Sequence, residues 1–176
     1  MKSIAELRSN FNLHVIEYSS QLRYLKNLEF DWDVFLPSRN RNLQRELVWT
    51  LDQKRELIMS VLLERHIPHF AVINTINREN PNKDIYLVID GKQRLSTLFD
   101  FLDDKFTIEL EGSEYLYSAL PKEYQLEISC SWIRYYCVNE PWEMERRITD
   151  DQKIAWFKLI NFAGTPQDKE YLDNLI

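Results

Sequence analysis

The stretch that most constrains the fold covers residues 85–103. Branched and aromatic side chains at 85–89 predict a buried strand, and apolar side chains recur at helical spacing from Leu95 to Leu102. Residues 90–94, Asp-Gly-Lys-Gln-Arg, lie between the two, so a strand turns directly into a helix there. Such a turn presents backbone N–H groups and the positive end of a helix dipole, and Lys92 and Arg94 add positive charge. The sequence therefore predicts a phosphate site at this turn.

A second interpretation of the turn stays open. In an ordinary strand-to-helix turn, Asp90 would hydrogen-bond the start of the helix, and Lys92 and Arg94 would point to solvent. A Walker loop needs more glycines and a Lys-Ser/Thr pair, and a dinucleotide fold needs Gly-x-Gly-x-x-Gly; the sequence has neither. The turn is therefore not a standard P-loop.

The remaining pattern predicts short strands and helices in mixed order. Strands are expected at residues 14–18, Phe70–Ile76 and 126–138, and a hairpin at 106–117. Helices are expected at residues 4–10, 52–65, 121–125 and 165–175, and between a capping box at Thr149 and a stop at Gly164. Residues 20–37 show no decisive periodicity. This order predicts an α+β fold with a small mixed sheet and flanking helices, in a single domain over residues 1–176 with 1–37 as an N-terminal extension.

The net charge and the two cysteines limit the classes of function that the sequence allows. With 28 acidic and 22 basic side chains the net charge is −6, so no overall positive field would hold nucleic acid. A local basic patch between residues 38 and 55 includes Arg39, Arg41 and Arg45. Cys130 and Cys137 have neither metal-ligand nor redox spacing, and no apolar run approaches the roughly 20 residues of a membrane span. We expect a reduced, cytoplasmic protein that does not enter a membrane.

Two further groups of side chains have alternative interpretations. Gln44, Arg45 and Trp49 form either a solvated loop packed on the core or a phosphate-binding segment, in which Arg45 would bind phosphate in a bidentate manner. His66 and His69 lie three residues apart without a zinc motif, so we interpret them as structural and expect no metal site.

Three ordered motifs carry a family resemblance. They are Asn42-Leu43-Gln44-Arg45-x-x-x-Trp49, Val88-Ile89-Asp90-Gly91-Lys92-Gln93-Arg94-Leu95-Ser96-Thr97-Leu98 and Ile160-Asn161-Phe162-Ala163-Gly164-Thr165-Pro166. Together they resemble the N-terminal domain of GmrSD-type modification-dependent restriction proteins. That family is often labelled by its Asp-Gly-Gln-Gln-Arg motif and is grouped with the ParB/sulfiredoxin-like fold. Lys92 stands where many members have Gln.

The resemblance implies a domain that binds, and in several members hydrolyses, a nucleoside triphosphate with Mg²⁺, coupled to recognition of modified DNA. Carried over by position, Asp90 and Arg94 would be catalytic, with Asp90 orienting the turn or holding Mg²⁺. The nucleotide-phosphate site would comprise Gln44, Arg45, Gly91, Lys92, Gln93, Arg94, Asn161, Gly164 and Thr165. Sulfiredoxin chemistry is not expected, because neither cysteine lies near the turn in sequence.

Three functional hypotheses follow. The first is an NTP-binding and NTP-hydrolysing domain of a restriction or phage-defence system. The second is a non-catalytic nucleotide-sensing or decoy module, of phage or prophage origin, that regulates a separate nuclease; it is motivated by the absence of the family's His-Asn-His nuclease motif from this chain. The third is a regulatory protein that binds DNA through Arg39 and Arg41. The sequence leaves the oligomeric state and the preferred base open.

Overall fold

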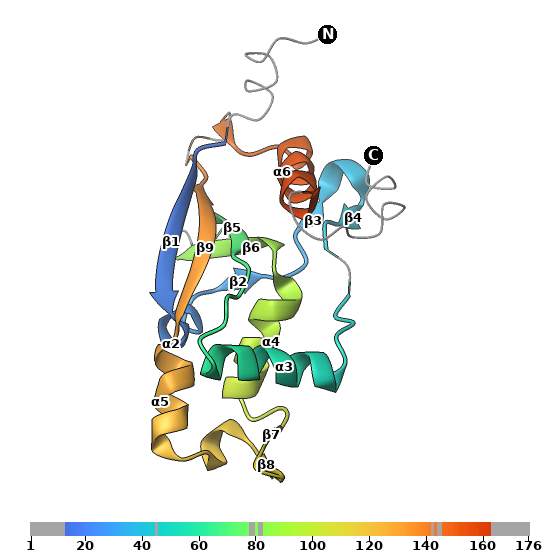
Figure 1. The fold of residues 1–176 in the computed structure, drawn as a ribbon. Helices are drawn as coiled ribbons and strands as arrows, with labels where there is room; N and C mark the ends of the chain where they lie inside the picture. Colours follow the sequence, from blue (N-terminus) through green and yellow to red (C-terminus); the bar gives the residue numbers. More distant parts are fainter. Residues whose placement is uncertain are drawn as a thin grey trace.

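A five-stranded mixed sheet forms the centre of the fold (Figure 1). The computed structural model describes residues 13–44, 46–77, 80, 83–141, 143 and 146–162. The strand order is β1 (Val15–Gln21), β9 (Trp132–Asn139), β5 (Phe70–Ile76), β6 (Asp84–Asp90) and β2 (Phe30–Asp31). β1 pairs with β9, and β5 with β6, in antiparallel orientation, whereas the β5–β9 and β2–β6 pairs are parallel. The predicted α+β class with a small mixed sheet is confirmed.

Helices cover both faces of this sheet. They are α2 (Leu22–Leu25), α3 (Leu51–Leu62), α4 (Lys92–Leu102), α5 (Lys122–Cys130) and α6 (Asp150–Phe162), with 3-10 turns at Pro37–Arg39 and Tyr117–Ala119. Two further strand pairs stand apart from the sheet: β3 (Phe35–Leu36) with β4 (Arg41–Asn42), and β7 (Ile108–Leu110) with β8 (Ser113–Tyr115).

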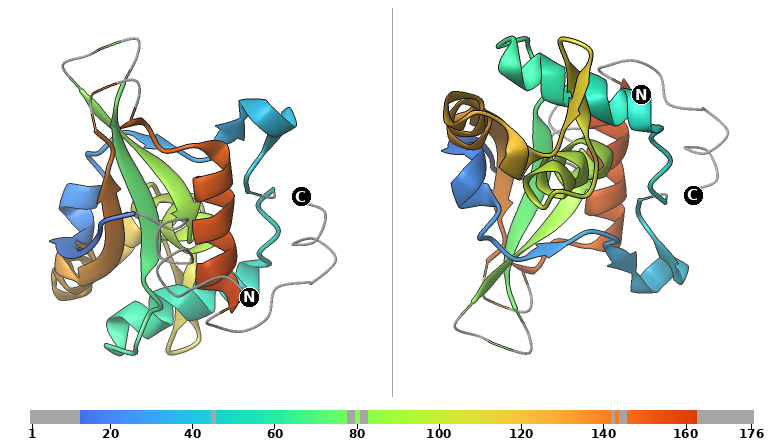
Figure 2. Two further views of the ribbon diagram at one scale, coloured as in Figure 1. Left: turned by 90° about the horizontal axis from the view of Figure 1, so that it is seen from above. Right: turned by 90° about the horizontal axis from the view of Figure 1, so that it is seen from below.

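The alternation of side chains along β5 divides the interior into two cores. Phe70 and Val72 belong to the core under α3, α4 and α5, whereas Ala71 and Ile73 belong to the core under α6. Figure 2 shows α6 along one flank of the sheet, next to β3 and β4. All four side chains are buried, so β5 is a central strand covered on both faces.

Several local predictions are confirmed. The β5 strand has the predicted bounds, and its antiparallel pairing with β6 brings the predicted neighbours together. The capping box at the start of α3 is formed: Thr50 Oγ1 accepts from Gln53 N at 3.3 Å, and Gln53 Oε1 accepts from Thr50 N at 2.9 Å. The same pattern joins Thr149 and Gln152 before α6.

The prediction of a strand-rich segment at 126–138 is wrong in its first part. α5 continues to Cys130, and β9 begins at Trp132. Leu126 and Ile128 alternate in the sequence as in a strand, but Leu126 is 48% exposed while Ile128 is fully buried against α2 and α3. Packing of one helix face therefore decided the structure of this segment.

Residues 20–37, which the sequence left undecided, contribute α2, β2 and β3. Leu22 and Leu25 of α2 enter the larger core, and β2 extends the sheet beside β6. The helices predicted at 4–10 and 165–175 and the stop at Gly164 lie outside the described residues. Within the described part, no helix combines the length and apolar character needed to cross a membrane.

Candidate functional site

In the turn between β6 and α4, the backbone of Gly91 lies close to Phe70 of β5. Asp90 ends β6, and Gly91 follows with φ +93°, a conformation that L side chains rarely adopt. A Cβ at Gly91 would lie only 2.4 Å from the Cβ of Phe70 on β5. Glycine therefore lets the N-terminus of α4 sit directly against the central strand.

The first turn of α4 receives no cap from its own N-cap residue. Gly91 has no side chain with which to bond the first N–H groups, and the first turn of α4 contains no acidic residue. The Oδ2 atom of Asp90 accepts a hydrogen bond from the Arg94 side chain, Nη2, at 2.7 Å. This end of the helix thus keeps the electrostatic character that favours an anion.

Both cations of the turn have internal partners. Arg94 Nη2 also donates to the His69 carbonyl at 3.2 Å, while Arg94 Nε is buried without a hydrogen-bond partner among the described residues. Lys92 is buried, and its Nζ lies 2.6 Å from Asp33 Oδ1. An anion arriving here would therefore compete with the Asp33 and Asp90 carboxylates for donors that are already in place.

Gln93 holds the segment before α3 against the turn. Its Oε1 accepts from Val48 N at 3.1 Å and from Trp49 N at 3.2 Å, and its Nε2 donates to the Glu46 carbonyl at 2.9 Å. The Gln93 side chain thus makes hydrogen bonds to three backbone groups, in the way that the backbone of a neighbouring strand does. Gln44 is anchored in a similar way, since its Nε2 donates to the Val88 carbonyl of β6 at 2.7 Å.

These residues surround a cavity of about 110 Å³. Its lining comprises Gln44, Trp49, Asp90, Gly91, Lys92, Gln93, Arg94 and Phe157. Sites that enclose a whole small molecule measure about 300–1,000 Å³, so this cavity matches a phosphoryl group rather than a nucleotide. The structure therefore brings Gln44 and Trp49 to the turn, and Trp49 also packs against the larger core, so the phosphate-binding role of this segment stays a prediction.

Of the predicted wall at Asn161, Gly164 and Thr165, the structure describes Asn161. Asn161 is buried, but its Nδ2 donates to the Phe157 carbonyl at 2.8 Å, and it does not line the cavity. Phe157, one helical turn earlier, lines the cavity instead. Phe157 lies four residues before Asn161, and this helical spacing could have identified it from the sequence. No sequence pattern near the turn identifies Asp33 as the partner of Lys92. Arg45, Gly164 and Thr165 lie outside the described residues.

The remaining candidates lie elsewhere. Arg39 forms an exposed ion pair with Asp151 at 2.8 Å, and Arg41 is half-buried; their contact with DNA stays a prediction. No cluster of three or more metal-ligating side chains occurs in the described ranges. The rings of His66 and His69 are 6.2 Å apart, on a different and larger cavity.

Comparison with known proteins gives one match. A family model described as GmrSD restriction endonuclease, N-terminal domain, matches residues 33–175. The matched range contains the whole β6–α4 turn, Gln44 and Asn161. No curated protein and no solved structure matches the chain.

Proposed function

The chain belongs to the GmrSD restriction endonuclease N-terminal domain family, and we propose that its β6–α4 turn binds the phosphate groups of a nucleoside triphosphate. Family membership makes the chain a component of a restriction system. The proposal concerns the ligand of this one turn and the way in which the turn would hold it.

One observation supports the proposal most directly: the N-terminus of α4, which its own N-cap residue leaves uncapped, borders a cavity of phosphoryl size that Lys92 and Arg94 also line. Backbone N–H groups, a helix dipole and two cations are the features that stabilise phosphate charge. Arg94 Nε, buried without a partner among the described atoms, is a donor that an incoming oxygen would satisfy.

Binding would rearrange the two ion pairs of the turn. Phosphate oxygens would take over donors of Lys92 and Arg94, which would release the carboxylates of Asp33 and Asp90. Carboxylate oxygens are the ligands that Mg²⁺ takes in phosphoryl-transfer sites, so Asp90, which lines the cavity, would be the residue that holds the ion. The ion would supply charge neutralisation at the phosphate.

The experiment measures affinity by calorimetry for ATP, GTP, CTP and UTP in the presence of Mg²⁺. Arg94→Ala should weaken triphosphate binding about tenfold or more, since hydrogen bonds to charged groups are among the stronger ones. Arg55→Ala is a suitable control, because Arg55 also bonds a carboxylate and a carbonyl, those of Glu114 and Thr107, and in addition the Thr107 hydroxyl. Its side chain is 23% exposed, against 21% for Arg94. Circular dichroism checks that both variants fold. Equal affinity of Arg94→Ala and the unmodified chain would overturn the proposal.

A second function, binding without hydrolysis, is favoured by the pairing of Asp90 with Arg94. If Arg94 stays paired with Asp90 when a nucleotide is bound, the Asp90 carboxylate is not available as a base. Such a module would sense a nucleotide and regulate a separate nuclease. Sustained phosphate release by the purified chain with Mg²⁺ and any of the four triphosphates would contradict this alternative and support a hydrolase.

A further inference from the structure

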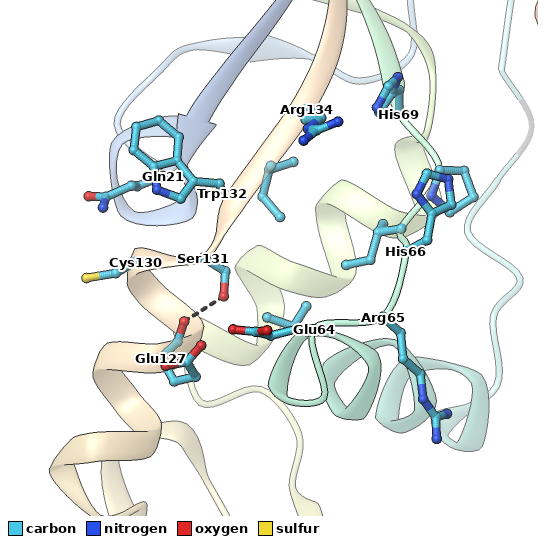
Figure 3. A pocket seen from close by; sticks show the side chains of 14 residues that line it. Gln21, Glu64, Arg65, His66, His69, Glu127, Cys130, Ser131, Trp132 and Arg134 are labelled. Carbon is cyan, nitrogen blue, oxygen red and sulfur yellow. Dashed lines mark hydrogen bonds between the residues drawn. The ribbon is translucent and has the colours of Figure 1, made fainter.

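A cavity larger than the one at the turn lies beside the start of β9 (Figure 3). It measures about 710 Å³ and opens between the segment after α3 and the start of β9. Pairing of β5 with β9 begins only at Phe70 and Tyr135. Upstream of that pair, residues 65–69 and 132–134 diverge, and Pro68 has no N–H with which to continue a ladder. The cavity is therefore a consequence of where the parallel pair starts.

Charged side chains of both signs line this cavity. Figure 3 shows Arg134 and His69 on one side and the carboxylates of Glu64 and Glu127 on the other. Neither Arg134 nor either glutamate forms an ion pair among the residues that the structure describes. This differs from the β6–α4 turn, where each cation already has a carboxylate. Groups of this kind can bind a ligand without first giving up an internal bond.

An exposed aromatic residue, Trp132, borders the cavity on the side of Gln21 (Figure 3). Along β9, Ile133 and Tyr135 point into the core, whereas Trp132 and Arg134 point outward on the same face. Trp132 is 66% exposed, the largest exposure among the exposed apolar side chains described. A tryptophan and an arginine two residues apart on one strand face form the combination that stacks on a nucleobase and neutralises its phosphate.

We propose that this cavity binds one nucleotide unit. The base stacks on Trp132, the phosphate accepts hydrogen bonds from Arg134, two residues further along the strand, and Glu64 and Glu127 accept from hydroxyl or amino groups. Each chemical part of a nucleotide thus has a matching side chain. The volume lies within the range of about 300–1,000 Å³ that encloses small ligands.

This site is separate from the triphosphate site but connected to it. His69 lines the cavity with its side chain, and its carbonyl oxygen accepts from Arg94 Nη2. The ligand is either a free nucleotide or a nucleotide of a single strand, and the two sources share the same chemistry. The proposal does not depend on what binds at the β6–α4 turn.

Calorimetric titrations of the full chain test the proposal with AMP, ribose 5-phosphate, adenosine and a single-stranded oligonucleotide. AMP should bind more tightly than ribose 5-phosphate, which lacks the base, and adenosine, which lacks the phosphate. Trp132→Ala should weaken AMP binding roughly 5- to 150-fold, the range for loss of one base-aromatic stack. Arg134→Gln should weaken it about tenfold or more.

Two surface variants on α5 are the controls. Tyr124→Ala removes another exposed aromatic ring, and Lys122→Gln removes another exposed positive charge. Both should bind AMP like the unmodified chain. If the oligonucleotide binds at least tenfold more tightly than AMP and depends on Trp132, the ligand is a nucleotide of a strand; if not, it is a free nucleotide. AMP binding that persists in Trp132→Ala, or is lost only in Arg94→Ala, would overturn the proposal.

Discussion

Replacement of Gly91 by alanine tests whether the close approach of α4 to β5 determines the geometry of the turn. Gly91 has φ +93°, and a Cβ there would meet the Cβ of Phe70 at 2.4 Å. A Cβ atom is fixed to its backbone, so no change of rotamer relieves this contact. Either α4 or β5 must therefore move.

The expected cost has two parts. The left-handed conformation costs an L residue about 1–2 kcal/mol, and an added methyl in a tightly packed place costs about 1–3 kcal/mol. Gly91→Ala should therefore lower the free energy of unfolding by about 2–5 kcal/mol. Gly112 provides the matched control, since it has φ +78° but no atom within 4 Å of its Cβ position. Gly112→Ala should lower the free energy of unfolding by only about 1–2 kcal/mol.

Urea denaturation followed by circular dichroism measures both free energies. The difference between the two variants isolates the contact with Phe70 from the cost of the backbone conformation. If Gly91→Ala and Gly112→Ala lower the free energy of unfolding by the same amount, the contact with Phe70 makes no contribution and the reasoning is refuted.

Two other perturbations test the turn and the core. Gln93→Ala should raise the rate of hydrogen exchange at the Val48 and Trp49 amides roughly 2- to 10-fold, because both amides donate to Gln93 Oε1. The exchange rate in β5 should stay the same. Unchanged exchange at residues 48 and 49 would contradict the role of Gln93. Burial raises the pKa of Tyr135 to about 12 from 10.0, and the nearby Tyr86 adds to the shift. Because the unfolded chain ionises first, the free energy of unfolding should fall as the pH rises from 10 to 12, and should fall less in Tyr135→Phe. Parallel urea denaturation curves across that pH range would disprove this prediction.

The segments that the sequence predicted well share one physical property. Along α4 the burial of side chains follows the helical period of about 3.6 residues. Along β5 the first four residues are all buried, so a short continuous apolar run marks a strand that is covered on both faces. In both segments the pattern of apolar residues describes the structure directly. The α5 segment failed because Leu126 is apolar but exposed, and its spacing from Ile128 imitated a strand. Residues 20–37 stayed undecided because their elements are too short for a period to appear.

The sequence by itself determined that a strand ends at Asp90 and a helix starts after Gly91, with an arginine and a lysine in its first turn. Local periodicity and the special conformation of glycine suffice for that conclusion. Only the tertiary structure decided that Lys92 meets Asp33, 59 residues away, and that Arg94 meets the carbonyl of His69. It also decided that a cavity of about 710 Å³ lies beside the start of β9. These features depend on which distant segments of the chain meet in the folded protein. The local sequence around each residue does not show which segments those are.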